Sequence, residues 1–414
     1  MIKKLLANNA ILIIQSAVSG LIPLLLIPHI VHVIGLGAYG ELAVALAWAS
    51  YGVVVVQYAF QSTGPKRLGQ LEPSETPHDI FVEITRAKFI LLFGVLASVA
   101  LAVLVMSSSG TKMPQIILLT LLPIGAAFNS GWFLQAAGRF LWICLTSIIA
   151  SCTALFIGYA LVRENGSFGV IGASLALSAG PMLVGVATFL ITNILLKDKP
   201  KKKQIKSFIH PLREGWPLFV SQLTSALYTV SGPIVISYLV STEAAGAYSI
   251  VERIINPLIG VCMLTHVAAY PRLASLYVNQ RAAYWKLLRF VVTAYLICSL
   301  VVIFSAVLAK PWLLSYLFGG KIPPGINALL GWGLVWFSLG IFGTAFTGYL
   351  VVSGKQNQVW PLTIKVLSIA VIIGIPGIYA FGAWAWLGAL VLSQTVVLYA
   401  VYKAWRTEII LRKE

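Results

Sequence analysis

The sequence predicts an all-α polytopic membrane protein with about twelve transmembrane helices. Two observations predict this class. Hydrophobic residues make up 59% of the chain and charged residues only 10%, with a mean hydropathy of +0.91. A soluble domain carries about 25% charged residues. The apolar residues also fall into successive runs of about 20, which is the length that an α-helix needs to cross a bilayer.

The predicted spans follow one another with short polar connections. The first run continues to Ile34, which is too long for the apolar region of a signal peptide, so we expect a retained span. The last two spans are separated only by the aromatic turn from Phe381 to Trp384. In order, the predicted spans cover residues 10–34, 40–62, 88–107, 115–136, 141–162, 170–196, 216–240, 245–270, 290–309, 326–350, 359–380 and 384–402.

The distribution of basic residues predicts the orientation. With the N-terminus in the cytoplasm, 23 of the 29 Lys and Arg residues fall in cytoplasmic segments and 4 in outward loops. Because Lys and Arg concentrate in cytoplasmic loops, this bias predicts that both termini are cytoplasmic. The net charge of +17 therefore reflects membrane topology and contact with membrane lipids, and we expect no nucleic acid partner.

The chain repeats itself around a basic linker. Gly37-Ala38-Tyr39 recurs as Gly246-Ala247-Tyr248, a lag of about 209 residues, each time at the start of the second span of its half. Six spans in each half would make the repeats parallel, as in transporters whose two lobes enclose a central cavity. We therefore predict two six-helix lobes around a central cavity, residues 1–196 and 214–414, joined by a basic cytoplasmic linker at 197–213.

One predicted span carries charges at depth. The run from Val240 to Tyr270 contains Glu252 and Arg253, and Arg253 lies about seven residues, or roughly 10 Å, below the outer interface. A charge inside a membrane costs at least about 2.5–3.5 kcal/mol, so it usually marks a water-filled cavity or a substrate path. An interhelical ion pair is the alternative. Lys365 lies inside the eleventh predicted span in the same way, unless its long side chain reaches the cytoplasm.

Signs of an enzyme are missing from the sequence. It contains no P-loop, no nucleophile elbow and no metal-ligand motif, and its 4 cysteines lie in apolar runs. Four of the few acidic residues, Glu72, Glu75, Asp79 and Glu83, are expected in the loop after the second span. His29 and His32 are spaced i, i+3 near the outer end of the first span and could couple transport to protons. We expect no cofactor beyond an ion or proton gradient.

Several longer runs resemble one family of transporters. They are Gly215-Trp216-Pro217-Leu218-Phe219, Gly246-Ala247-Tyr248-Ser249, Val251-Glu252-Arg253-Ile254-Ile255, Gly35-Leu36-Gly37-Ala38-Tyr39-Gly40 and Trp132-Phe133-Leu134-Gln135. In these runs the chain is similar to polysaccharide flippases of the Wzx type, which share the MOP superfamily with MATE drug exporters. The sequence departs from that pattern after Gln135, where Ala136-Ala137-Gly138-Arg139 lacks an acidic residue.

The resemblance implies a function in surface polysaccharide assembly. Such a flippase moves oligosaccharide repeat units linked to undecaprenyl pyrophosphate from the cytoplasmic to the periplasmic leaflet by alternating access, for O-antigen, lipopolysaccharide or capsule. It implies a multi-pass protein of the bacterial inner membrane, with a polysaccharide polymerase and a chain-length regulator as expected partners. Basic residues would bind the phosphates. The candidate substrate-binding residues are Arg253, Lys365, Arg139, Arg86, Lys88 and Glu252.

Two other functions are compatible with many spans. A MATE-type exporter of organic cations would need buried carboxylates, whereas the charges predicted at depth here are mainly basic. A membrane scaffold that transports nothing would explain the spans but not Arg253 or the repeat. The balance of charges inside the spans therefore favours a transporter of an anionic cargo.

Overall fold

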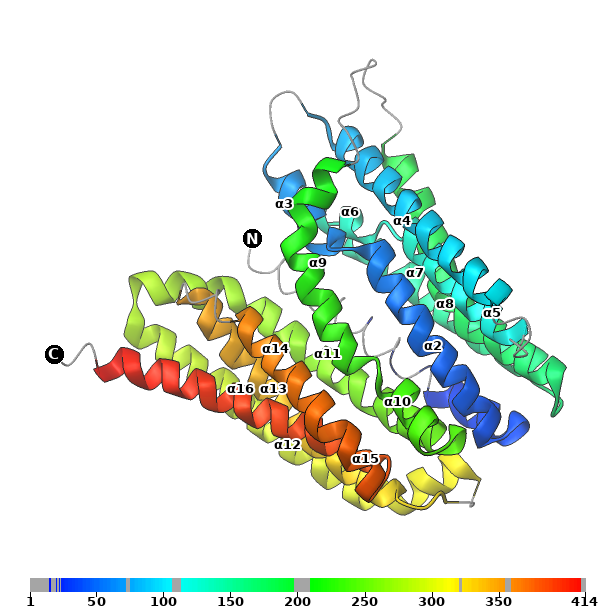
Figure 1. Cartoon of the computed structure of the whole chain (residues 1–414). Helices are drawn as coiled ribbons and strands as arrows, with labels where there is room; N and C mark the ends of the chain where they lie inside the picture. The colour runs from blue at the N-terminus through cyan, green and yellow to red at the C-terminus, as the bar shows by residue number, and fades with distance from the viewer. Residues whose placement is uncertain are drawn as a thin grey trace. The chain divides into compact units, whose positions relative to one another are not determined.

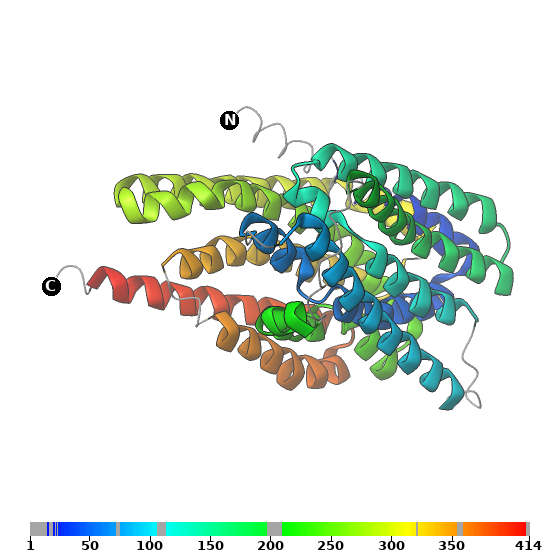
Figure 2. The same ribbon diagram turned by 90° about the horizontal axis from the view of Figure 1, so that it is seen from above.

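The computed structural model of the chain describes residues 15, 20, 22, 24–71, 75–105, 113–196, 209–319, 322–353 and 359–410. All elements in these ranges are helices (Figures 1 and 2). After a helix at Leu24–Ile34 they are α2 Leu36–Gln57, α3 Phe60–Gly69, α4 Pro77–Val105, α5 Met113–Phe128, α6 Gly131–Ala136, α7 Phe140–Leu161, α8 Ser167–Leu195, α9 Ile209–Thr229, α10 Gly232–Leu239, α11 Thr242–Asn279, α12 Arg281–Phe318, α13 Ile326–Val352, α14 Val359–Ile369, a π-helical turn Ala370–Gly374, α15 Ile375–Phe381 and α16 Trp384–Ile410.

Ten helical segments of the described chain are long and apolar enough to cross a membrane, which confirms the predicted class. They correspond to ten of the predicted spans. Of the first predicted span, 10–34, the structure describes a continuous helix only at Leu24–Ile34, and the eighth falls within α11, a helix of 38 residues. The count of twelve therefore stays a prediction.

The chain forms two compact units, Met1–Ile234 and Val235–Glu414. In the first unit, α5 packs against α8 and α2, and α8 also packs against α7. Small residues allow close approach of the backbones, as is common between transmembrane helices. A Cβ added to Gly185 of α8 would lie 2.2 Å from the carbonyl oxygen of Gly125 of α5. The helix α9 also packs in this unit, against α2, α3 and α4. The predicted division into lobes 1–196 and 214–414 stays a prediction.

In the second unit, α13 is central and packs against α16, α11 and α12. The elements α14, the π-helical turn and α15 lie along α16 (Figure 2). The short turn between the last two spans is present: Gly382 adopts φ +84°, a backbone conformation that favours glycine, and α16 begins two residues later.

The repeated tripeptide occupies equivalent places in the two units. Tyr39 lies in the first turn of α2 and Tyr248 lies near the start of α11, and both side chains are fully buried. Each tyrosine thus anchors the start of a long helix to the interior of its own unit.

Candidate functional site

Three spans are interrupted within the first unit: the second, the fourth and, between α9 and α10, the seventh. The second predicted span breaks between α2 and α3 at Tyr58, a non-glycine residue with φ +51°. The fourth breaks between α5 and α6 at Asn129 and Ser130. Interrupted helices leave backbone polar groups that other parts of the protein must satisfy, and transporters often place binding sites at such breaks.

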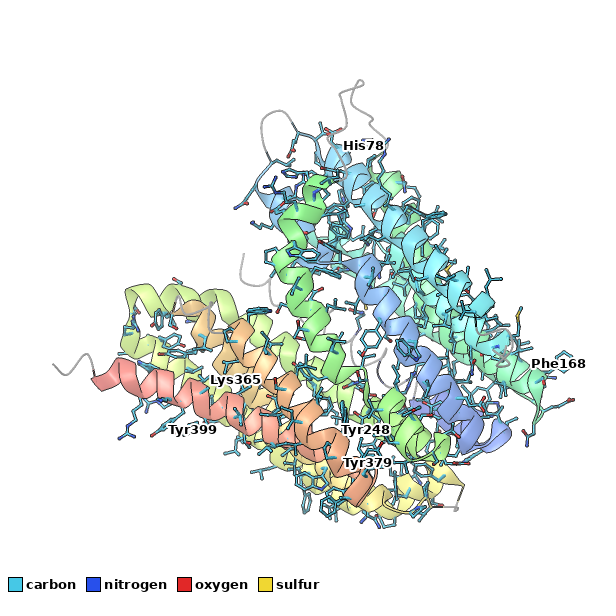
Figure 3. All side chains as sticks on the ribbon, in the orientation of Figure 1. His78, Phe168, Tyr248, Lys365, Tyr379 and Tyr399 are labelled. Carbon is cyan, nitrogen blue, oxygen red and sulfur yellow. The ribbon has the colours of Figure 1, made fainter. Side chains whose placement is uncertain are left out.

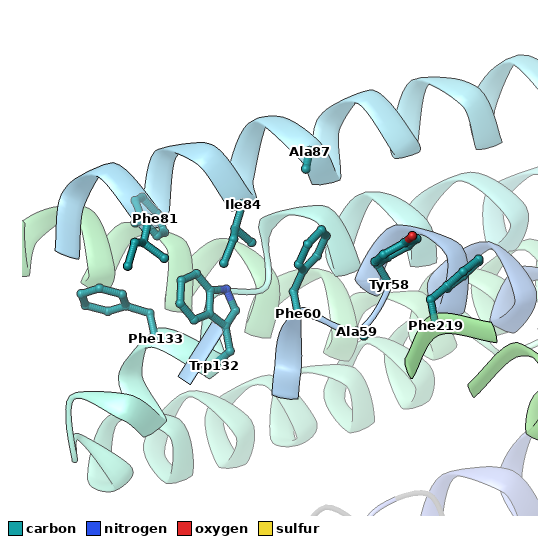
Figure 4. Close-up of a cluster of buried hydrophobic side chains, with 10 residues drawn as sticks. Tyr58, Ala59, Phe60, Phe81, Ile84, Ala87, Trp132, Phe133 and Phe219 are labelled. Carbon is teal, nitrogen blue, oxygen red and sulfur yellow. The ribbon is translucent and has the colours of Figure 1, made fainter. Parts of the chain in front are cut away.

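An aromatic cluster surrounds the interruptions of the second and fourth spans. It contains Tyr58, Phe60, Phe81, Trp132 and Phe133, all buried, together with Phe219 of α9 (Figure 4). The ring of Tyr58 stacks on Phe219 with centroids 4.3 Å apart, and its hydroxyl donates a hydrogen bond of 2.9 Å to the carbonyl of Leu212. Gly64 of α3 accommodates the ring of Trp132, because a Cβ there would lie 2.4 Å from that ring. The cluster thereby holds α3, α4, α6 and α9 together.

Lys88 donates hydrogen bonds to backbone carbonyls that the break between α5 and α6 leaves without helical partners. Its side chain is 2% exposed, and Nζ donates to the carbonyl oxygens of Asn129 at 2.6 Å and Ala126 at 3.4 Å. These carbonyls belong to the C-terminal end of α5, where helical carbonyls lack partners and a cation is favourable. Asn129 Oδ1 accepts a hydrogen bond from the backbone N–H of Gly131, so a free N–H at the start of α6 also has a partner.

A buried ion pair lies next to this break. Arg67 of α3 donates from Nη2 to Glu83 Oε2 of α4 at 2.9 Å, and both side chains are less than a tenth exposed. The same guanidinium lies 3.6 Å from Glu75 and, through Nε, 3.9 Å from Glu214 of α9. Lys66, which is 60% exposed, pairs with Glu214 at 3.2 Å. These residues form a charge cluster, Lys66, Arg67, Glu75, Glu83 and Glu214, that joins α9 to α3 and α4.

The prediction that four acidic residues lie in the loop after the second span is wrong for two of them. Asp79 and Glu83 lie in α4, which begins at Pro77, eleven residues before the predicted span. The charged turns remain helical because Arg67 neutralises Glu83 and because Thr76 bonds to the carboxylate of Asp79 at 3.0 and 2.7 Å. A hydropathy pattern does not contain this information, since the neutralising residues come from other segments.

The other predicted residues of the first unit lie apart from this centre. Arg86 of α4 and Arg139 at the start of α7 are exposed. Before Arg139, Gly138 adopts φ +68° and closes the end of α6. His29 is half-buried, donates a hydrogen bond of 2.9 Å from Nε2 to the carbonyl oxygen of Val162 and stacks on Tyr159, whereas His32 is exposed. Proton coupling by these histidines stays a prediction.

The predicted residues of the second unit lie on two helices. Glu252 and Arg253 are half-buried on α11, and Glu252 hydrogen-bonds Asn256 one turn later in the same helix. Lys365 is exposed on α14 (Figure 3). The geometry of the first unit brings Lys88 to the interruption of α5, whereas Arg86 and Arg139 are exposed. The substrate-binding roles of all six residues stay predictions.

Sequence reasoning missed the charge cluster around Arg67. Two signals were present: Pro65-Lys66-Arg67 follows a long apolar run, and four acidic residues follow within the next 16 positions. Basic and acidic groups so close in sequence are compatible with pairing, but only the fold shows which of them are buried. Within the described residues, no group of three His, Cys, Asp or Glu side chains could hold a metal ion.

Replacing Lys88 with methionine is expected to destabilise the protein by about 1–3 kcal/mol, because two buried carbonyls at the end of α5 would lose their donor. Unfolding in detergent measures this. The exposed neighbour Arg86, replaced with methionine, serves as the matched control and is expected to change stability by less than about 0.5 kcal/mol. Equal stability of the two variants would contradict a structural role for Lys88.

Three comparisons place the chain among known proteins. A family model described as "Polysaccharide biosynthesis protein" matches residues 5–277. A Shigella dysenteriae protein named "Putative O-antigen transporter" is 18% identical over 400 residues, which cover 96% of this chain and 99% of that protein.

Solved structures share the fold. "Lipid II flippase MurJ, inward closed conformation" has a TM-score of 0.70 and 17% identity, covering 94% of this chain and 85% of that one. An inward-facing multidrug transporter of the MATE family and MOP superfamily has a TM-score of 0.64 and 17% identity, covering 97% and 95%. The chain is therefore a multi-pass membrane protein with the fold of these transporters.

Proposed function

The chain belongs to the polysaccharide biosynthesis protein family, and we propose that it is a flippase for oligosaccharide repeat units linked to undecaprenyl pyrophosphate. The predicted resemblance is confirmed at the level of family and fold. In this proposal the cargo crosses from the cytoplasmic to the periplasmic leaflet of a bacterial inner membrane by alternating access. The lobes 1–196 and 214–414 enclose the path, and a polysaccharide polymerase receives the product under a chain-length regulator.

The charge of the second unit carries this proposal. Between Arg253 and Thr407 the sequence has eleven Lys and Arg residues and no Asp or Glu. A region with that balance attracts an anion, and a pyrophosphate linked to a sugar is such an anion. The first unit differs, because its buried Arg67 and Lys88 already have partners inside that unit. The stretch from Arg253 to Thr407 in the second unit contains no carboxylate of its own, and this supports phosphate recognition there.

The pairing of the buried carboxylates argues against an exporter of organic cations. Such an exporter needs a carboxylate that is available to the cargo. Glu83, a buried carboxylate of the first unit, is 2.9 Å from Arg67 and therefore neutralised. Glu252 has a hydrogen-bond partner in its own helix.

Complementation tests the proposed function. The chain is expected to restore surface polysaccharide to a bacterial strain that lacks its own flippase of the matching repeat unit, and to leave the accumulation of ethidium unchanged. Lower ethidium accumulation without restored polysaccharide would favour cation export instead. Labelling of a cysteine at position 407 from the periplasmic side would contradict the proposed cytoplasmic termini.

Lys365 gives a prediction of its own. If its ammonium contributes to the positive potential of the path, Lys365→Ala is expected to reduce export several-fold, because one point charge is lost. Lys365→Arg keeps the charge and serves as the control. Since Lys365 is exposed on α14, its long side chain can instead reach the aqueous interface. Export at the wild-type level in Lys365→Ala would support that alternative.

A further inference from the structure

The helix α12 presents two different faces. A buried stripe, repeating every three or four residues, packs on the rest of the second unit; it consists of Tyr284, Leu288, Val291, Tyr295 and Ser299. The opposite face exposes large apolar side chains, namely Phe290, Ile297, Leu300, Phe304 and Leu308, each more than half exposed. In a bilayer such a face contacts acyl chains.

The charges of α12 mark how it crosses the membrane. Between Arg289 and Lys310 the helix has no charged residue. This stretch of 20 residues is roughly 30 Å long, which equals the thickness of the hydrocarbon core. Arg289 therefore lies at one edge of the core. The nine residues from Arg281 to Arg289 extend roughly 12 Å beyond that edge, through the headgroup layer.

Two basic side chains continue the exposed apolar face into the headgroup layer. Lys286 and Arg289 are both exposed and stand three positions apart, which places them on one face of the helix. Phe290 follows directly and is 71% exposed. Arg289 Nε donates to the carbonyl of Trp285, one turn earlier in the helix, at 3.4 Å. A lipid lying on the apolar face would thus have its phosphate beside both cations.

The sequence on either side of Lys286 and Arg289 contains no acidic residue over a long stretch. The acidic residue that precedes them, Glu252, lies 27 residues before the end of α11, roughly 40 Å away along the helix. The sequence has no other Asp or Glu before Glu408. The pair therefore lies in a long stretch of sequence that contains only basic charges.

We propose that Lys286 and Arg289 form a headgroup site for an anionic phospholipid whose acyl chains lie along the exposed apolar face of α12. The site combines a basic pair with a continuous apolar stripe on one helix face, and both parts are needed for a lipid rather than a soluble anion. It does not depend on the proposed flippase function, since both of its parts lie on one helix, α12.

Native mass spectrometry of the full-length protein in detergent tests the site. Dioleoyl phosphatidylglycerol is the anionic probe and dioleoyl phosphatidylcholine the zwitterionic one. The wild type is expected to bind phosphatidylglycerol more tightly than phosphatidylcholine. K286Q/R289Q is expected to weaken phosphatidylglycerol binding roughly thirty-fold, because two charges near an anionic headgroup are lost. K310Q/K403Q removes the same charge from the second unit and is expected to keep the wild-type affinity.

Three outcomes would overturn the proposal. They are unchanged phosphatidylglycerol binding in K286Q/R289Q, an equal loss in K310Q/K403Q, and full displacement of the lipid by inorganic phosphate. The first would remove the basic pair from the site, the second would show a general charge effect, and the third would show a site for free anions. K286R/R289K keeps both charges and should bind as the wild type does, which separates the lost charge from misfolding.

Discussion

Replacing Glu83 with glutamine is expected to destabilise the protein by about 3–5 kcal/mol, the larger of the two effects on folding predicted here. The substitution preserves the shape of the side chain but removes the charge that faces Arg67 at 2.9 Å. Arg67 is 8% exposed, so its guanidinium would then be buried with Glu75 3.6 Å away as its nearest anion. Unfolding of the purified protein by dodecyl sulfate in mixed micelles measures the loss.

A surface pair in the same cluster provides the matched control. Lys66 and Glu214 are 3.2 Å apart but 60% and 28% exposed, so solvent screens them. Glu214→Gln removes that pair and the more distant 3.9 Å contact with Arg67, and is expected to cost about 0–1 kcal/mol. If Glu83→Gln lowers the free energy of unfolding no more than Glu214→Gln does, burial does not strengthen the ion pair between Arg67 and Glu83.

A double substitution distinguishes the effect of the ion pair between Arg67 and Glu83 from the effect of their side-chain packing. Replacing both Arg67 and Glu83 with methionine removes two buried charges together and leaves neither unpaired. Apolar replacements of a buried ion pair are often neutral or stabilising. R67M/E83M is therefore expected to be more stable than R67M alone, so that the two substitutions are not additive. Additive losses would show that each side chain stabilises the protein through separate contacts.

Replacing Arg253 with alanine is expected to abolish export of the lipid-linked oligosaccharide while the protein level stays normal. The residue is half-buried on α11 beside Glu252, and no further acidic residue follows it before Glu408. A guanidinium there can bind a phosphate through two parallel hydrogen bonds, and its loss leaves the cargo without that partner. Surface polysaccharide in the complementation assay measures export, and immunoblotting of membranes measures the protein level.

Two further variants distinguish how Arg253 acts. Arg253→Lys keeps a point charge but loses the planar fork, so it is expected to fail if the phosphate is bound by two parallel bonds. Lys310→Ala removes a basic residue of α12, eight positions before the helix ends at Phe318, and should export normally. Normal export by Arg253→Ala, or a loss caused only by reduced protein level, would show that Arg253 is not a transport residue.

The break at Asn129 and the extended start of α4 show what sequence patterns leave out. The hydropathy of residues 115–136 predicts one span, whereas the structure divides it into α5 and α6. Lys88, 41 positions earlier, satisfies the carbonyl of Asn129 that this break releases. Likewise α4 begins before the predicted span because Arg67, 16 positions before Glu83, neutralises the carboxylate of Glu83. Both features depend on partners that a local window of sequence does not include.

The sequence by itself determined the membrane class and the positions of ten helical spans, because transfer of an apolar segment into a bilayer depends on that segment alone. It also showed the repeated tyrosines and the stretch from Arg253 to Thr407 without acidic residues. Only the tertiary structure decided which charges are buried and paired, where spans two, four and seven are interrupted, and that α9 packs with the first unit. The physical reason is that the cost of a buried charge or a broken helix depends on the groups that surround it, and those groups come from distant parts of the chain.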